Sequence, residues 1–345
     1  MRAVSYSTTG GPLNIVEVDS PTCPEAGAVI EVRATGVCRS DWHAWRGHDP
    51  VTLPHIPGHE FAGVVAHVGP RVTGFAVGDR VTAPFVNGCG GCDYCLTGHA
   101  QVCPSQTQPG FTGAGSFAEH VVVEQADTNL VRLPDGLDFV TAAALGCRFA
   151  TSFHALTAQA ELRAGEWVVV FGCGGVGLSA VMVAHCLGAS VVAVDPSPAA
   201  RARAAELGAD VVVDAFDPVP QVLAVTAGGA HVGMDAVGSA ATAAAAVHSL
   251  RRRGRHVQVG LMLEGNSRAP LPWDLVVARE LRILGSHGMA AADYPVMLEL
   301  ILAGRLHPEL LVGRVIGFDD LAEALRSMDE PSELAGIAVA DLARS

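Results

Sequence analysis

Apolar runs alternate with Ala-rich segments in the part of the chain between about residue 150 and residue 285. Segments such as 198–207 and 240–250 have the composition of helices, and each lies between two short apolar runs. Alternation of buried strands with helices is typical of a doubly wound parallel sheet, in which helices cover both faces. The sequence therefore predicts an α/β domain whose six strands lie at 167–171, 190–194, 211–213, 232–237, 256–260 and 281–285.

The pattern is different in the first 145 or so residues, which are rich in Gly, Pro and Val. Short runs such as 28–37 and 60–69 have the composition of strands joined by turns, so they predict an irregular all-β domain. After about residue 286 the pattern predicts a helix at 294–304 and another within 315–328.

One stretch of the α/β part carries no charged side chain between Trp167 and Val194. A membrane-spanning helix is one interpretation of an apolar stretch of this length. The glycines within 172–177 interrupt it, however, and strand-like and helix-like patterns alternate on either side. A buried β-α-β unit explains the same composition, so we expect no membrane span.

Composition and charge narrow the class of protein. The chain has 345 residues, enough for two domains with full cores, and its net charge of −13 disfavours nucleic acid and anionic membranes as partners. The basic run RRRGR at 251–255 is interpreted as the solvated end of a helix. The chain contains no Lys, which excludes Schiff-base and P-loop lysine chemistry. Nine Cys without a signal-peptide core predict reduced thiols and a cytoplasmic location.

A glycine-rich loop, FGCGGVG at 171–177, follows a predicted strand and opens a predicted helix. Its GxGxxG pattern allows a tight turn and the close approach of a pyrophosphate to a helix N-terminus. Asp195 ends the next predicted strand, where a carboxylate accepts hydrogen bonds from ribose hydroxyls and repels a 2′-phosphate. This favours NAD over NADP. The residues predicted to bind the dinucleotide are Gly172, Gly174, Gly175, Val176, Gly177 and Asp195.

Four of the cysteines are clustered in the stretch CGGCDYCLTGHAQVC, at positions 89, 92, 95 and 103. Disulfides suit small secreted domains rather than a long chain without an export signal. Four thiolates suit a tetrahedral zinc ion, and an iron–sulfur cluster is the chemical alternative. Because four protein ligands leave zinc no open position, the sequence predicts a structural site formed by Cys89, Cys92, Cys95 and Cys103.

Two other segments, 36–43 (GVCRSDWH) and 57–65 (PGHEFAGVV), contain no pattern that physical chemistry alone assigns to a metal. Cys38 alone is compatible with a small buried side chain, and His59 with a hydrogen-bonded core histidine. Residues 38–65 nevertheless resemble the catalytic-zinc segment of the zinc-containing alcohol dehydrogenases, in the medium-chain dehydrogenase/reductase family.

Three other motifs carry the same resemblance, in the family's order through most of the chain. The cysteine cluster resembles the lobe that holds the family's second zinc, AAALGCRFATSFHAL (142–156) resembles its third-ligand segment, and GCGGVG resembles its coenzyme loop. The resemblance implies a GroES-like irregular β catalytic domain joined to a Rossmann coenzyme domain.

The resemblance also implies an open zinc site formed by Cys38, His59 and Cys147, with its fourth position left for water or alcohol. Asp41 matches the carboxylate that orients the ring of the zinc-bound histidine. Glu60 matches an acid that lies near the metal and can exchange onto it.

Further roles follow from the same matches. Ser40 and His43 match the relay that takes the alcohol proton to solvent through the nicotinamide ribose. Arg39 matches a pyrophosphate contact, Thr151 a residue at the nicotinamide, and Phe85 a wall of the substrate pocket.

The implied function is the NAD-linked interconversion of a primary or secondary alcohol with its aldehyde or ketone, through an alkoxide on the zinc and hydride transfer. A polyol, amino-alcohol or formaldehyde dehydrogenase of the same family is the alternative. A non-catalytic dinucleotide-binding protein is a more remote one, and it would lack a complete open zinc site. The implied cofactors are two Zn²⁺ per chain and NAD(H).

The predicted catalytic domain is discontinuous. It spans 1–148 and 286–345, with the structural-zinc lobe at 86–105, and surrounds a coenzyme domain at 149–285. Ile337 follows Gly336 at a position where the family often has Arg or Lys, so a second phosphate contact is not expected there. The short segment between Cys103 and Phe117 favours the compact bacterial form, usually a homotetramer, over a dimer.

Overall fold

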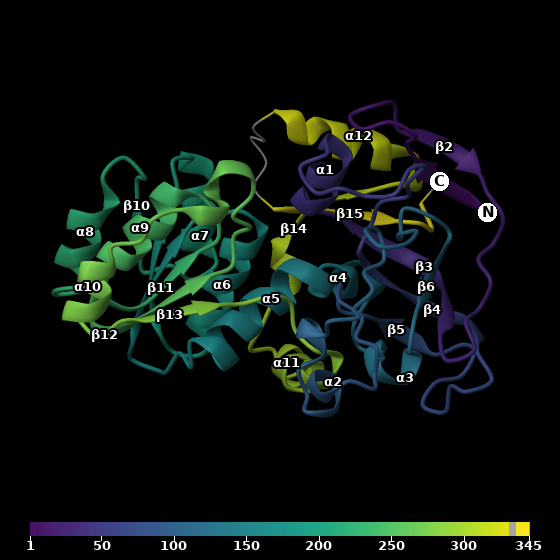
Figure 1. Ribbon diagram of the computed structural model, residues 1–345, viewed down its shortest axis with the longest axis horizontal. Helices are drawn as coiled ribbons and strands as arrows, with labels where there is room; N and C mark the ends of the chain where they lie inside the picture. The colour runs from purple at the N-terminus through teal and green to yellow at the C-terminus, as the bar shows by residue number, and fades with distance from the viewer. Residues whose placement is uncertain (331–335, 345) are drawn as a thin grey trace.

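Six parallel strands form the central sheet of one half of the molecule. The computed structural model describes residues 1–330 and 336–344 (Figure 1). In space the strands follow the order β10-β9-β8-β11-β12-β13. This order reverses beside the first strand, as in doubly wound nucleotide-binding sheets, and confirms the predicted fold. The strands are β8 (Trp167–Phe171), β9 (Ser190–Val194), β10 (Val211–Val213), β11 (Ala230–Asp235), β12 (Leu250–Gln258) and β13 (Arg282–Gly285).

Helices cover both faces of this sheet, which explains why its strands are apolar without alternation. In β8, Val168 and Val170 pack in the same core cluster as Leu178 of α6. The intervening Val169 packs in a second cluster with Val222 of α8. Because both faces of β8 are buried, every position along it favours an apolar side chain. The helices of this half are α6 (Gly175–Cys186), α7 (Pro198–Glu206), α8 (Pro218–Val225), α9 (Ala240–His248) and α10 (Trp273–Ala278).

A mixed sheet organises the other half, in the spatial order β14-β15-β3-β4-β5-β7, with β6 also paired to β3. β15 pairs antiparallel with β3, so the C-terminal segment lies in the sheet of the N-terminal half (Figure 1). This pairing supports a discontinuous domain, while its limits near 148 and 286 stay predictions. The strands are β3 (Ala28–Val37), β4 (Glu60–Val68), β5 (Arg80–Thr82), β6 (His120–Val123), β7 (Val131–Arg132), β14 (Val312–Ile316) and β15 (Ile337–Asp341).

The remaining strands and helices lie around this second sheet or connect it to the first. The strands are β1 (Arg2–Ser5) and β2 (Asn14–Glu17). The α-helices are α1 (Arg39–Arg46), α2 (Asp93–Leu96), α3 (Ala126–Asn129), α4 (Phe139–Ala143), α5 (Ala150–His154), α11 (Tyr294–Leu302) and α12 (Leu321–Arg326). Two π-helical segments, η2 (Leu145–Phe149) and η3 (Ala155–Gln159), flank α5. Short 3₁₀ helices are η1 (Ala100–Val102), η4 (Glu264–Arg268), η5 (Ala291–Asp293), η6 (Pro308–Leu311), η7 (Phe318–Asp320) and η8 (Ser327–Asp329).

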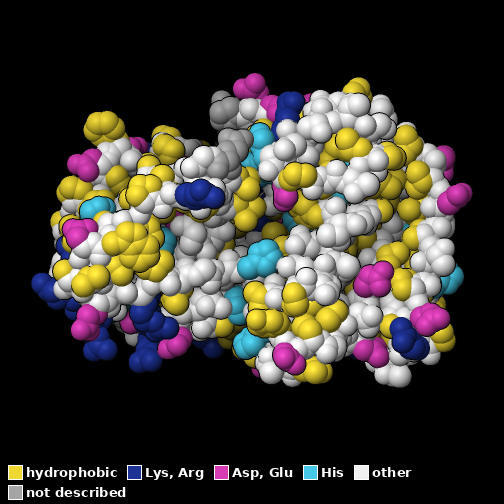
Figure 2. Space-filling view, viewed as in Figure 1, with side chains coloured by type: hydrophobic (Ala, Val, Ile, Leu, Met, Phe, Trp, Pro, Cys, Tyr) yellow, Lys and Arg dark blue, Asp and Glu magenta, His cyan; other side chains and the backbone are white. Residues whose placement is uncertain are grey.

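The prediction that the basic run at 251–255 ends a helix is wrong, because these residues belong to β12. Helix α9 ends at His248, and the buried Leu250 begins the strand. The register between β11 and β12 shifts just after Leu250, so exposed arginines are accommodated at the start of the strand. Arg side chains gather at the lower left of Figure 2, on this half of the molecule.

The uncharged stretch from Trp167 to Val194 consists of β8, α6 and β9. Among the described residues, no helix is long and apolar enough to cross a membrane.

Met234 tests the packing of the parallel sheet, since it is fully buried in the central strand β11. We expect Met234→Ala to cost about 2–5 kcal/mol, because the cavity it leaves cannot close completely. The melting temperature of the variant should fall by about 4 °C or more. Val77→Ala, at a position 64% exposed between β4 and β5, is the control and should leave the melting temperature within about 2 °C of wild type. Equal melting temperatures for the two variants would contradict the assigned core.

Candidate metal centres and active-site cavity

A cavity of about 610 Å³ lies between the two halves of the molecule and receives side chains from both. The N-terminal half contributes Cys38 and His59, and the parallel-sheet half contributes the glycine loop at 172–177. Figure 2 shows a hollow along this boundary, with histidine side chains beside it. A cavity with convergent polar groups between domains is the usual location of a small-molecule site.

Three residues far apart in the sequence converge on one wall of this cavity. Cys38 follows β3, His59 precedes β4, and Cys147 lies in the π-helical segment η2. One potential ligand atom from each lies within 4.8 Å of the other two. Two sulfurs and one imidazole nitrogen form a donor set that suits zinc, and three protein ligands leave a fourth position for another molecule. The structure thus brings together the trio expected from the resemblance.

Asp41 holds two members of this trio, Cys38 and His59, in position. It is fully buried on α1, and its Oδ1 accepts a hydrogen bond of 2.8 Å from Nδ1 of His59. The same carboxylate accepts hydrogen bonds of 3.0 Å from the backbone N–H groups of Cys38 and Gly58. Gly58 has φ of +101°, and a Cβ there would lie 2.5 Å from the ring of Phe117, so the residue before His59 must be glycine.

The other ring nitrogen of His59 supports metal binding at this position. Nε2 is buried, and within the described ranges it has no hydrogen-bond partner of suitable geometry. A buried polar atom without a partner destabilises a folded protein, whereas a metal ion would satisfy this nitrogen. The donor set and this unpartnered atom both fit zinc.

The pKa shifts of Cys38 and His59 also favour the binding of a metal ion. A hydrogen bond from Cys147 holds the pKa of Cys38 well below its ordinary value, which gives Cys38 the thiolate character that zinc needs. The same hydrogen bond raises the pKa of Cys147. Burial alone would lower the pKa of His59, but the Asp41 carboxylate raises it well above the usual range. A carboxylate partner of this kind increases the basicity of the histidine as a ligand.

Glu60, next to His59, is held by an arginine that the sequence analysis did not single out. Nε of Arg148 donates a hydrogen bond of 3.0 Å to Oε1 of Glu60, and Nη2 donates to Oε2. The backbone N–H of Arg148 also donates to Oε1, at 3.2 Å. Both residues are buried. Burial raises the pKa of Glu60 despite the arginine, whereas Glu60 overcomes the effect of burial on Arg148 and raises its pKa above the ordinary value.

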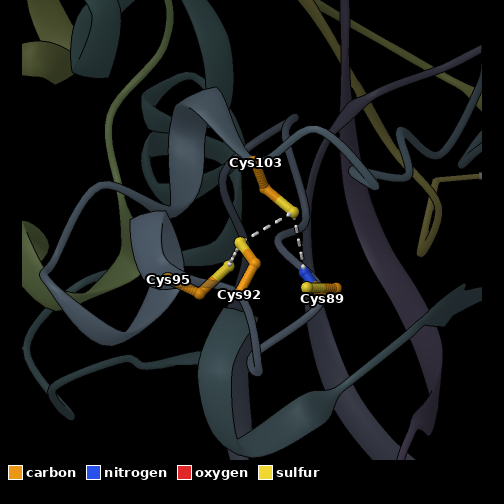
Figure 3. A group of neighbouring side chains, drawn as sticks. All are labelled: Cys89, Cys92, Cys95 and Cys103. Atoms are coloured by element: carbon orange, nitrogen blue, oxygen red, sulfur yellow. Dashed lines mark hydrogen bonds between the residues drawn. The ribbon is translucent and has the colours of Figure 1, made fainter.

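A second cysteine group forms a separate centre, in the lobe that contains α2 and η1. Figure 3 shows the four sulfurs pointing toward one another. The Sγ of Cys92 lies 3.5 Å from that of Cys95 and 3.7 Å from that of Cys103. A tetrahedral zinc with Zn–S bonds of about 2.3 Å places its sulfurs about 3.8 Å apart, whereas a disulfide requires about 2.05 Å. The separations therefore fit a closed metal site. The members are Cys89, Cys92, Cys95 and Cys103.

Backbone N–H groups support this second centre. Those of Cys89 and Ser105 lie 3.4 and 3.3 Å from Sγ of Cys103. Hydrogen bonds from the backbone of Gly91 and from neighbours in the cluster lower the pKa of Cys89 to about 6. Thiolates held by such donors are suited to bind a cation.

The glycine loop has the geometry of a phosphate-binding turn. β8 ends at Phe171, Gly172 has φ of +89°, and α6 begins at Gly175. A Cβ on Gly177 would lie only 1.7 Å from the carbonyl oxygen of Gly172, so this close turn excludes any side chain. The carboxylate of Asp195 anchors the loop, since its Oδ2 accepts a hydrogen bond of 2.7 Å from the N–H of Cys173.

Most of the other residues predicted to act in the site also line this cavity, whereas Asp41, Glu60, Gly172 and Gly177 lie behind its lining. His43 is one of the lining residues, and its Nδ1 lies 3.0 Å from Nδ1 of His48. Burial lowers the pKa of His43, so its ring is neutral near pH 7. The rings of Phe85 and His59 are in edge-to-face contact, with their centroids 6.1 Å apart. The predicted residues that line the cavity are Arg39, Ser40, His43, Phe85, Thr151, Gly174, Gly175, Val176 and Asp195.

Sequence reasoning missed several lining residues, among them Gln108, Phe111, Arg148 and His287. Of these, only Arg148 could have been noticed in the sequence, because it is the single Asp, Glu, Lys or Arg in the apolar stretch 139–160. The others lie on loops without a motif. His55 lies outside the metal groups found among the described residues, and its Nε2 is 2.8 Å from the carbonyl oxygen of Gly110.

Comparison with known proteins shows similarity over nearly the whole chain. Residues 24–135 match the family model of the alcohol dehydrogenase GroES-like domain, and residues 175–303 match that of the zinc-binding dehydrogenases. An alcohol dehydrogenase of Geobacillus stearothermophilus is 36% identical over 310 residues, which cover 89% of this chain and 90% of that protein.

Solved structures agree with this similarity. The alcohol dehydrogenase TADH from Thermus sp. ATN1 superposes with a TM-score of 0.92 at 30% identity, covering 99% of each chain. An NAD-dependent alcohol dehydrogenase superposes with a TM-score of 0.89 at 30% identity, covering 99% of this chain and 100% of that one.

Two glycine variants separate the folding of the loop from its binding role. We expect Gly177→Ala to lower both the melting temperature and the affinity for NADH, because the new Cβ collides with the backbone of Gly172. Gly174→Ala should keep the melting temperature, since no atom lies within 4 Å of its Cβ position, and should weaken NADH binding because the methyl group enters the cavity. Thermal unfolding and NADH fluorescence titration measure both effects. Wild-type NADH affinity in both variants would be incompatible with a coenzyme site at this loop.

Proposed function

The chain belongs to the zinc-binding alcohol dehydrogenase family, and we propose that its catalytic centre is the trio Cys38, His59 and Cys147. The enzyme oxidises a primary or secondary alcohol to an aldehyde or ketone with NAD, and catalyses the reverse reaction. The observation that carries the proposal is the convergence of three zinc-type ligands, including the unpartnered Nε2 of His59, on a cavity shared with the glycine loop.

We propose two zinc ions per chain with different tasks. The trio leaves one coordination position for the substrate, as a catalytic zinc requires. The four-cysteine cluster supplies four thiolates and leaves no such position, so its zinc would stabilise the lobe that carries it. The sulfur separations near 3.5–3.7 Å in that cluster support this assignment.

When bound, zinc supplies a Lewis acid that makes the alcohol hydroxyl more acidic, and NAD supplies the acceptor for hydride. Residues of the chain prepare the site for this chemistry. Asp41 holds Nδ1 of His59 and so directs Nε2 toward the metal position. The aromatic side chains of Phe85 and Phe111 line the same cavity, where they exclude water and would contact the substrate.

The proton of the alcohol must reach solvent, and we assign this transfer to Ser40 and His43. Ser40 Oγ lies 3.9 Å from Sγ of Cys38, beside the metal position. His43 lines the same cavity, and its neutral ring can accept a proton.

For the coenzyme, we propose that the glycine loop and the N-terminus of α6 bind the pyrophosphate. Asp195 would accept hydrogen bonds from the ribose hydroxyls and disfavour NADP. Arg39 would contact the pyrophosphate, and its Nη1 donates a hydrogen bond of 2.5 Å to the carbonyl oxygen of Met328. Thr151 and Val176 would lie against the nicotinamide.

We further propose a homo-oligomer, with a tetramer favoured over a dimer, and a cytoplasmic location. The terminal position of β13 in the parallel sheet supports association. Trp273 and Val277 on α10 are exposed apolar side chains on the same half of the molecule. We also propose that the domain limits lie at 148 and 286.

Zinc analysis of Cys38→Ser tests the catalytic centre. We expect about two zinc ions per wild-type chain and about one in the variant, because loss of one of three protein ligands opens the site. Alcohol oxidation, followed as NADH absorbance with primary, secondary and polyol substrates, should fall below detection.

Cys23→Ser is the matched control, since Cys23 lies outside both metal groups among the described residues. It should retain both zinc ions and the activity. A wild-type protein with one zinc and no NAD reduction on any alcohol would refute the proposed centre.

Asp195→Ala tests the choice of coenzyme. We expect the ratio of kcat/KM with NADP to that with NAD to rise about tenfold, equivalent to about 1.4 kcal/mol. Loss of the carboxylate removes its repulsion of a 2′-phosphate and leaves Arg201 nearby, where Nη1 is 2.6 Å from the carbonyl oxygen of residue 195. Steady-state kinetics with both coenzymes provide the measurement. Asp274→Ala, an exposed change on α10, should leave the ratio unaltered, and an unaltered ratio in Asp195→Ala would argue against its role.

A further inference from the structure

Arg148 lies between the proposed catalytic centre and the glycine loop. It directly follows Cys147 in η2, and its side chain is only 9% exposed. The outer edge of its guanidinium group, Nε and Nη2, donates to both carboxylate oxygens of Glu60. Among the described residues, every hydrogen bond to the Glu60 carboxylate comes from Arg148. The position of this carboxylate beside His59 therefore depends on one side chain.

The same side chain also packs against the coenzyme loop. A Cβ on Gly175 would lie 2.4 Å from Cδ of Arg148 and 3.4 Å from its Nε and Nη1. Cδ of Arg148 thus occupies the space that a side chain at the first residue of α6 would need, and the guanidinium group lies in contact with the loop. Gly36 makes room on the other side, because a Cβ there would lie 2.5 Å from Oε2 of Glu60 and 3.3 Å from Nη2 of Arg148.

One edge of Arg148 remains available to a ligand. Nη1 has no hydrogen-bond partner among the residues that the structure describes, and Arg148 lines the cavity beside Gly174, Gly175 and Val176. A guanidinium group has five donors, of which Glu60 uses those on the Nε and Nη2 side. A cation held against a glycine loop at a helix N-terminus adds to its attraction for a pyrophosphate.

We propose that Arg148 is a positioning residue that couples the coenzyme loop to the metal centre, holding Glu60 with one edge and supporting the pyrophosphate site with the other. This inference rests on the proposed roles of the trio and the loop. A purely structural role would not require an arginine here, since an apolar pair of similar size usually stabilises a buried site as well. Nor would it require that Nη1 face the cavity or that the side chain pack against the glycine loop.

Two measurements on purified protein test the coupling. NADH affinity is measured by fluorescence titration, and the metal centre by the visible absorption of protein in which Co²⁺ replaces zinc. In Arg148→Lys, one charge remains but the two-pronged contact with Glu60 is lost. We expect the NADH Kd to rise about tenfold to a hundredfold, the usual effect of losing a hydrogen bond to a charged group. The cobalt absorption should also shift, because Glu60 is no longer held in place.

Two other arginines serve as comparisons. Arg39→Ala should weaken NADH binding and leave the cobalt spectrum unchanged, since among the described residues Arg39 contacts Met328 and Trp42 rather than Glu60. Arg163→Ala, exposed on a surface turn, should change neither. A change in only one of the two measurements for Arg148→Lys, or in neither, would overturn the coupling.

A double variant separates coupling from folding, because Arg148→Met alone would leave Glu60 buried without its partner. Glu60→Gln combined with Arg148→Met removes both charges together. We expect this variant to fold and to bind NADH at least tenfold more weakly. If it folds and keeps the wild-type NADH Kd, the inference is wrong. Wild-type protein that binds neither cobalt nor NADH would instead refute the proposed function, so the two failures are distinguishable.

Discussion

The buried carboxylate of Asp41 is the interaction on which the arrangement of the active site depends. It accepts hydrogen bonds from the backbone of Cys38, from the backbone of Gly58 and from the ring of His59. These groups belong to the start of α1 and to the segment that leads into β4, so one side chain fixes two proposed metal ligands relative to each other. A carboxylate buried in this way is stable only because its oxygens are satisfied by hydrogen bonds. The hydrogen bonds of Asp41 therefore hold two of the proposed metal ligands in position.

The location of the proposed site also depends on the contact between two halves of different architecture, one with a mixed sheet and one with a parallel sheet. The mixed sheet carries Cys38 and His59, while the parallel sheet presents the glycine loop at the carboxyl end of β8. Open parallel sheets bind ligands at this edge, next to the point where the strand order reverses. η2 and α5 run between the halves and bring Cys147 and Arg148 to the boundary. The proposed active site thus lies where neither half of the molecule alone supplies all of its residues.

The sequence predicted the parts in which local pattern and burial agree. The limits of β8 were predicted to the residue, because both of its faces are buried and its flanks are polar or glycine. The basic run at 251–255 was assigned wrongly, since long arginine side chains reach solvent as easily from a strand as from a helix end. The proposed catalytic trio came only from the family resemblance, because no local pattern joins Cys147 to Cys38. Arg148 was missed since its partners, Glu60 and Gly175, are close to it only in the folded chain.

The contact between Arg148 and Gly175 has a consequence for the evolution of this sequence. Cδ of Arg148 occupies the space of a Cβ at position 175, so a side chain acquired there has to displace the arginine from its present position. Gly36 is under the same restriction through Oε2 of Glu60. Substitutions at these sites should be inherited together, and a chimera that joins η2 of one lineage to the coenzyme loop of another should be disrupted at this contact even when each half is folded.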